Sequence, residues 1–171
     1  MNGDAVGRLR KLLCALHARH GYCQGHNYIA AHLLLEASGE GSSDEDLFWV
    51  LAAATQTCHG MWSETMPLCQ LSVAKIDSQL KARHPALAAH LSRHAVQSVG
   101  EVARPWLLCL FAHPSIPQAW RTWLWDLMAA SGAEFTAGEE DQARAHVALA
   151  HAQLAVVVIA ARLEARLLQT T

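Results

Sequence analysis

Apolar residues recur every three or four positions along most of this chain, and that spacing places them on one face of an α-helix. The first such stripe runs from Val6 to Leu16, after Asp4, a suitable N-cap, and before Gly21, a residue typical of helix ends. Asp44 is a comparable N-cap for the third helix. The later predicted helices span residues 27–37, 47–57, 66–83, 86–94, 102–112, 119–131 and 138–168. No segment alternates as a strand does, so the pattern predicts an all-α fold.

The connection between the first two helices, residues 21–26, holds a single glutamine, Gln24, between two apolar segments. Gly21 ends the first helix, and Gly25 is best explained by a close backbone approach or by a positive φ. In a short, rigid turn of this kind, the Gln24 amide can point outward. The alternative is a glutamine that is hydrogen-bonded to the local backbone and has only a structural role.

The composition is that of one packed domain, because 52% of the 171 residues are hydrophobic and only 16% are charged. The net charge of −2 and the scattered Lys and Arg residues give no basic surface for nucleic acid and no polybasic patch for a membrane. The most apolar stretch, Val147 to Ala161, is too short and too polar to span a bilayer. The N-terminus lacks the pattern of a signal peptide. We therefore expect a soluble, intracellular protein.

The five cysteines and eleven histidines raise the question of a metal site. Two cysteines and two histidines follow one another at intervals of three, Cys14, His17, His20 and Cys23, but on a helix those side chains drift through about 180° and cannot converge on one ion. His90 and His94 share a helical face without an evident third ligand. We therefore predict no metal and expect the cysteines to be buried, reduced thiols.

Five segments, taken in order, resemble one known family. Residues 22–27, Tyr-Cys-Gln-Gly-His-Asn, resemble the Tyr-x-Gln-Gly-x-Asn motif of the TBC domain, the helical domain of proteins that activate Rab-family GTPases. The other four segments, in family order, are 46–51, 70–91, 104–112 and 125–128. Together they extend the resemblance over roughly residues 8 to 168. Met128 replaces the usual aromatic of the last segment, and Trp123 stands where the family usually has a basic residue.

The resemblance implies a single multi-helix TBC-type domain over residues 1–171 that is partial, because it lacks the first helices of the family. It implies that Gln24 is the catalytic residue that orients the attacking water, and that Tyr22, Gly25 and Asn27 belong to the GTPase-binding site. We expect Tyr22 and Asn27 chiefly to support the turn. The partner, a Rab-family small GTPase, would carry GTP and Mg²⁺, so no cofactor is expected in this chain.

The same family uses a second catalytic side chain, an arginine in an Ile-x-x-Asp-x-x-Arg motif well before the glutamine. The 23 residues that precede Gln24 contain no such motif. Arg8 and Arg10 are the arginines that could replace it, and the alternative is that both lie on a solvated basic face with Lys11. The absence of the first helices would also leave apolar surface uncovered, which predicts poor solubility or self-association.

Two functions therefore remain open at this stage. The first is a GTPase-activating domain for a Rab protein, and the second is a catalytically inactive TBC-type module that binds a Rab or another protein. A helical protein unrelated to GTPases is a third interpretation. The first two imply a cytoplasmic protein of vesicle trafficking, with peripheral membrane association through its partner at endomembrane surfaces and no transmembrane segment.

Overall fold

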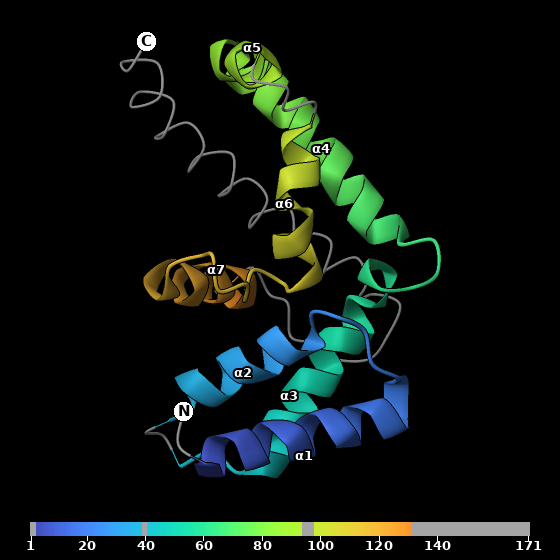
Figure 1. Ribbon diagram of the computed structural model, residues 1–171, viewed down its shortest axis with the longest axis vertical. Coiled ribbons are helices and arrows are strands. Elements are labelled where there is room, and N and C mark those ends of the chain that lie inside the picture. Colours follow the sequence, from blue (N-terminus) through green and yellow to red (C-terminus); the bar gives the residue numbers. More distant parts are fainter. Residues whose placement is uncertain (1–2, 39–40, 94–97, 131–171) are drawn as a thin grey trace.

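The computed structural model describes residues 3–38, 41–93 and 98–130, and within these ranges every regular element is a helix (Figure 1). The predicted all-α fold is thereby confirmed. The α-helices are α1 (Gly3–His20), α2 (His26–Glu36), α3 (Asp44–Thr57), α4 (Pro67–Arg83), α5 (Pro85–Arg93), α6 (Val99–Leu108) and α7 (Gln118–Ala130), and a 3₁₀ turn, η1 (His59–Met61), follows α3. The helix predicted at 138–168 lies outside the described residues.

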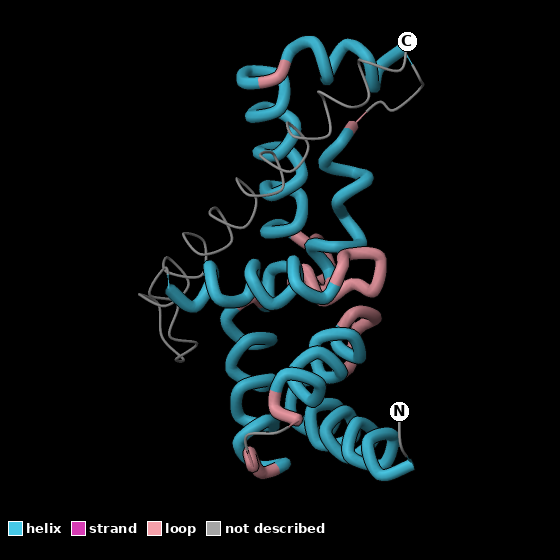
Figure 2. Tube along the Cα trace, turned by 90° about the vertical axis from the view of Figure 1, so that its left-hand side faces the viewer, coloured by secondary structure: helices cyan, strands magenta, loops and turns pink. Residues whose placement is uncertain are grey.

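The helices form two groups along the long axis of the molecule. α1, α2 and α3 pack together at one end, α4, α5 and α6 form the other, and α7 lies between them beside α2 (Figures 1 and 2). Fully buried Leu16, Ile29 and Leu51 join the first group, and Ile76 and Leu107 join the second. One apolar core runs through both groups, since all these side chains belong to a single buried cluster.

The end of α6 differs from the prediction, because the helix ends at Leu108 rather than at residue 112. Leu110 and Phe111 both have positive φ angles, 43° and 62°, which a right-handed helix excludes. Their side chains are almost completely buried, so apolar burial offsets the backbone strain. No glycine marks this turn in the sequence, which is why the apolar pattern gave no sign of it.

The start of α3 also differs from the prediction, since its N-cap is Ser43 and not Asp44. The Ser43 hydroxyl accepts a hydrogen bond from the Asp46 N–H at 3.1 Å, and the Asp46 carboxylate accepts one from the Ser43 N–H at 3.1 Å. This reciprocal pair is a capping box. Asp44 instead accepts a hydrogen bond from Nε of Arg8 at 2.5 Å and so ties α1 to the start of α3. Asp4, likewise, lies inside the first turn of α1 rather than at its N-cap.

The cysteines are only partly as expected. All five are free thiols, but Cys14 is exposed on α1 and Cys23 is half-buried, whereas the other three are buried. Leu12 and Leu16 occupy the core-facing side of α1, which leaves Cys14 on its outer side. Among the described residues, none of the helices is long and apolar enough to cross a membrane, and the stretch 147–161 lies outside them.

Candidate functional site

Gln24 lies in the tight turn that connects α1 to α2. α1 ends where Gly21 adopts a φ of 81° and its N–H donates to the His17 carbonyl oxygen at 3.0 Å. α2 starts after Gly25, whose carbonyl oxygen accepts the N–H of Tyr28 at 3.0 Å. The Gln24 side chain is exposed and makes no hydrogen bond to any described residue. Both the donor and the acceptor of its amide are therefore available to another molecule.

Tyr22 and Asn27 stabilise this turn from its two ends. The Asn27 Oδ1 atom accepts the N–H of Gly25 and the hydroxyl of Tyr22, both at 3.3 Å. Asn27 thus fixes the backbone next to Gln24, while the Tyr22 ring stays half-exposed at 49%. The Tyr22 ring also packs against the ring of His26 in a T-shaped arrangement, with ring centroids 5.9 Å apart.

Gly25 is required because the turn presses against the end of α6. A Cβ atom at this position would lie 2.3 Å from the carbonyl oxygen of Leu108, and the φ of Gly25 is 117°. Both observations confirm what the sequence predicted of this glycine, since a side chain would collide and the backbone conformation is unfavourable to L-residues. The same Leu108 oxygen accepts the indole N–H of Trp62 at 2.9 Å. One carbonyl at a helix end therefore positions both the turn and the segment after η1.

His26 is a part of the site that sequence analysis missed. Its ring is 5% exposed and packs edge-on against Trp62, with ring centroids 4.7 Å apart. Its Nδ1 atom accepts the N–H of Cys23 at 3.2 Å, so the neutral ring carries its proton on Nε2, which has no hydrogen-bond partner among the described residues. Burial lowers the pKa of His26 to about 4, which keeps the ring neutral at pH 7. Because it occupies the variable position of the motif, the pattern gave no signal for it.

The two arginines considered as catalytic replacements lie in different surroundings. Arg8 is bound to Asp44 and its guanidinium approaches the Ser42 carbonyl oxygen at 3.5 Å, so it does not belong to a solvated face. Arg10 lies roughly 16 Å along the axis of α1 from Gly21, at 1.5 Å per residue. Neither guanidinium is therefore next to the turn. Among the residues that the structure describes, no cluster of three His, Cys, Asp or Glu is placed to bind a metal.

Two later segments of the resemblance contact the glutamine turn or the helix α2 that follows it. Segment 104–112 supplies the Leu108 carbonyl on which Gly25 rests. Segment 125–128 packs α7 on α2, because the Trp125 ring lies 5.1 Å from the ring of His32 and Met128 is buried. The Thr122 hydroxyl adds a hydrogen bond to the Glu36 carboxylate at 2.9 Å. Segments far apart in the sequence thus meet around the helix that carries the glutamine turn.

Comparison with known proteins identifies the family to which this chain belongs. The family model of the Rab-GTPase-TBC domain matches residues 1–140, so the chain belongs to that family. Among curated proteins, TBC1 domain family member 2A of Mus musculus is 33% identical over 110 residues, which are 61% of this chain and 11% of the relative. The Homo sapiens protein of the same name gives the same identity and coverage.

A second relative is shorter. Growth hormone-regulated TBC protein 1 of Rattus norvegicus is 30% identical over 115 residues, 67% of this chain and 38% of the relative. The chain thus spans about a tenth of the first two relatives and less than two-fifths of this one. Among solved structures, none matches the chain.

Proposed function

We propose that this chain is a GTPase-activating domain for a Rab-family small GTPase, in which Gln24 orients the water that attacks GTP. The observation that carries the proposal is the pairing of a rigid turn with an unbound amide. Asn27 and Leu108 hold the turn, while the Gln24 amide makes no internal hydrogen bond. A carboxamide can accept a proton of the water with its oxygen and donate to an anionic oxygen with its NH₂ group.

The chemistry of GTP hydrolysis explains what each of the two proteins would contribute. Phosphoryl transfer to water needs in-line positioning and stabilisation of the charge on the phosphoryl oxygens. The GTPase supplies GTP and Mg²⁺, and this chain supplies an unbound amide on a turn whose backbone is fixed. Tyr22 and Asn27 hold the turn, and the exposed ring of Tyr22 contacts the partner. On this proposal the protein acts in the cytoplasm, at the endomembrane surfaces where its partner is bound.

The source of the positive charge that the reaction needs favours a second function. An arginine supplied in trans is worth roughly 10³ to 10⁵ in rate, and here the Arg8 guanidinium is bound to Asp44. We therefore expect this chain to accelerate hydrolysis weakly. A module that binds a Rab without acceleration is the second candidate, because the surface around Gln24 is as available for binding as for catalysis.

Single-turnover hydrolysis of GTP by a panel of Rab proteins tests both candidates. The chain is compared with its Gln24→Ala variant and with a matched control, Gln56→Ala, which removes another exposed glutamine, on α3. Acceleration that Gln24→Ala abolishes and Gln56→Ala preserves would support the activating domain. Binding to a GTP-loaded Rab without acceleration would support the second function. If no Rab is bound or accelerated, both candidates fail.

A further inference from the structure

Both peptide groups that flank the Cα atom of Gln24 are hydrogen-bonded within the turn. The carbonyl oxygen of Cys23, which belongs to the peptide group before Gln24, accepts the backbone N–H of His26 at 3.2 Å. The N–H of Gly25, which belongs to the peptide group after Gln24, donates to Oδ1 of Asn27 at 3.3 Å. The backbone of Gln24 is therefore fixed on both sides by the first two residues of α2.

The imidazole of His26 adds a further hydrogen bond on the N-terminal side of the glutamine. Its Nδ1 atom accepts the Cys23 N–H at 3.2 Å, so His26 holds Cys23 by both its N–H and its carbonyl oxygen. A side-chain acceptor thus restrains a peptide N–H on each side of Gln24, an imidazole nitrogen before it and an amide oxygen after it. Removal of Nδ1 would leave the Cys23 N–H without this acceptor, and the turn would have to shift to reach another.

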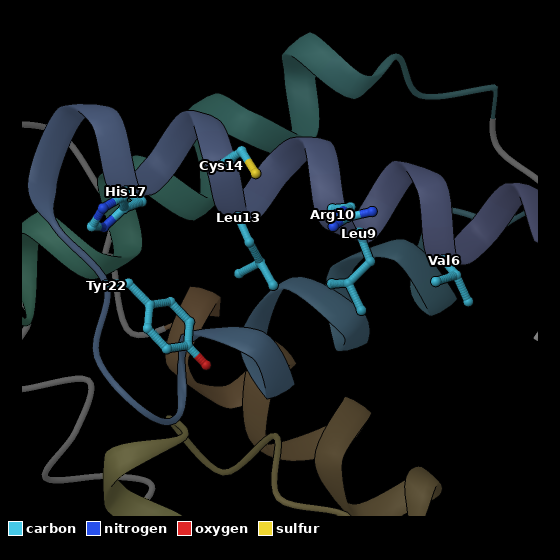
Figure 3. Close-up of a pocket in the computed structure, with 7 residues that line it drawn as sticks. All are labelled: Val6, Leu9, Arg10, Leu13, Cys14, His17 and Tyr22. Carbon is cyan, nitrogen blue, oxygen red and sulfur yellow. The ribbon is translucent and has the colours of Figure 1, made fainter.

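The direction of Nδ1 is fixed because the His26 ring is 5% exposed and contacts two other rings. The Trp62 ring lies 4.7 Å away, and its indole N–H is bound to the carbonyl oxygen of Leu108. The Tyr22 ring lies 5.9 Å away and nearly perpendicular. Together with His17, near the end of α1, Tyr22 lines an open groove (Figure 3). The imidazole therefore connects the core of the protein to the exposed glutamine turn.

Three replacements of His26 separate its hydrogen-bond acceptor from its shape. Burial lowers the pKa of His26 to about 4, so the native ring is neutral at pH 7 and its Nδ1 atom keeps the lone pair. Leucine fills a comparable space but has no acceptor. Asparagine places Oδ1 at the same number of bonds from the backbone as Nδ1, whereas glutamine places its oxygen one bond farther away. Of the three, asparagine should therefore be the one that accepts the Cys23 N–H.

We propose that His26 is a positioning residue for Gln24, which acts through the Cys23 N–H to set the direction in which the glutamine leaves the turn. This inference rests on the proposed function and adds to it the residue that holds Gln24 in place for the attacking water. The buried His26 ring does not contact the GTPase itself. A misplacement of about 1 Å can cost about 10²-fold in rate, so loss of this hydrogen bond should lower the rate of hydrolysis far more than the affinity.

Single-turnover hydrolysis by a GTP-loaded Rab, measured over a range of concentrations of this chain, separates rate from affinity. The maximal rate reports how Gln24 is positioned, and the concentration that gives half of it reports binding. His26→Leu and His26→Gln should lower the maximal acceleration roughly tenfold to a hundredfold, with the half-maximal concentration changed by less than about threefold. His26→Asn should recover most of the lost acceleration. The matched control is Ile76→Val, a core substitution in α4 that lowers stability without altering the turn and should leave both values unchanged.

Hydrogen exchange of the Cys23 backbone amide, followed by NMR, tests the hydrogen bond without a partner. This amide should exchange more slowly in the unmodified chain and in His26→Asn than in His26→Leu and His26→Gln. Urea unfolding shows which variants are folded. If His26→Leu does not fold, the comparison of His26→Asn with His26→Gln is sufficient, because both carry the same amide group and differ by one methylene.

Loss of the maximal rate in His26→Gln, its recovery in His26→Asn and the same order of exchange rates together support the inference. Equal losses in these two variants would mean that the ring only fills space. A parallel rise in the half-maximal concentration would mean that His26 shapes the binding surface, and an equal loss in Ile76→Val would mean that stability alone is measured. Each of these results overturns the inference and leaves the proposed function standing, as long as Gln24→Ala abolishes acceleration. Absence of acceleration by the unmodified chain would remove the activating function, and the positioning role of His26 with it.

Discussion

Replacement of Gly25 by alanine is the most direct test of how the glutamine turn is held. The substitution adds one methyl group, and this group meets two obstacles. The backbone has a φ of 117°, where alanine is strained, and the new Cβ would lie 2.3 Å from the Leu108 carbonyl oxygen. The strained conformation costs about 1–3 kcal/mol, and forcing a methyl group into a packed contact costs about 1–3 kcal/mol more.

We therefore expect Gly25→Ala to lower the free energy of unfolding by about 2–6 kcal/mol, a large part of the stability of a typical domain. Two other glycines separate the two costs. Gly41 has a φ of 71° with open space around it, so Gly41→Ala reports the backbone term alone. Gly100 would place a Cβ 2.3 Å from the Val73 carbonyl oxygen without a positive φ, so Gly100→Ala reports the close approach alone.

Urea unfolding followed by far-ultraviolet circular dichroism measures all three variants against the unmodified chain. Gly25→Ala should be the least stable of the three, because it combines both costs. Where Gly25→Ala still folds, it should also lose any acceleration of GTP hydrolysis, since the turn must move away from Leu108. A Gly25→Ala variant within about 0.5 kcal/mol of the unmodified chain, which is the usual effect of a surface substitution, would refute the close contact between the turn and α6.

Two further predictions concern the groups behind the turn. Trp62→Phe keeps a ring against His26 but removes the indole N–H that donates to Leu108, so the free energy of unfolding should fall by about 1 kcal/mol in the same urea assay; no change would contradict that bond. The lowered pKa of His26, about 4 against 6.5, means that the unfolded chain binds more protons between these values, so stability should fall as the pH is lowered from 6.5 towards 4, by up to about 3 kcal/mol. His32, whose pKa burial also lowers, adds a loss of the same sign. His26→Leu should flatten the profile measured by urea titration at several pH values, and an unchanged slope would contradict the assignment.

The sequence predicted the helices well because their apolar spacing is a direct consequence of burying one face. It also predicted the turn at Gln24 and the need for a glycine at Gly25, since both follow from local backbone geometry. It could not predict the positive φ angles of Leu110 and Phe111, because these are imposed by tertiary burial against local preference. His26 was missed for a related reason: its role depends on Trp62, a residue 36 positions away that no local pattern connects to it.

The way α6 ends explains why a segment so far from the glutamine belongs to the same family pattern. Its contribution to the turn is a backbone carbonyl, that of Leu108, which is left free because Leu110 and Phe111 turn the chain away from the helix. Gly25 and Trp62 both use that oxygen, one by close approach and the other by a hydrogen bond. The backbone of the turn is therefore held by this chain itself, and on the proposed function little backbone entropy would be lost when the GTPase binds.

Pre-organisation of the turn supplies no positive charge to the phosphoryl oxygens. Orientation of the water and neutralisation of the phosphoryl oxygens are separate contributions, and an arginine in trans alone accounts for roughly 4 to 7 kcal/mol of the barrier. On the proposed function the Gln24 turn supplies the first contribution, whereas the Arg8 guanidinium is bound to Asp44 and Arg10 lies roughly 16 Å along α1 from Gly21. Binding of a GTPase and acceleration of its hydrolysis are thus expected to respond to different substitutions, and Gln24→Ala should reduce the acceleration more than the binding.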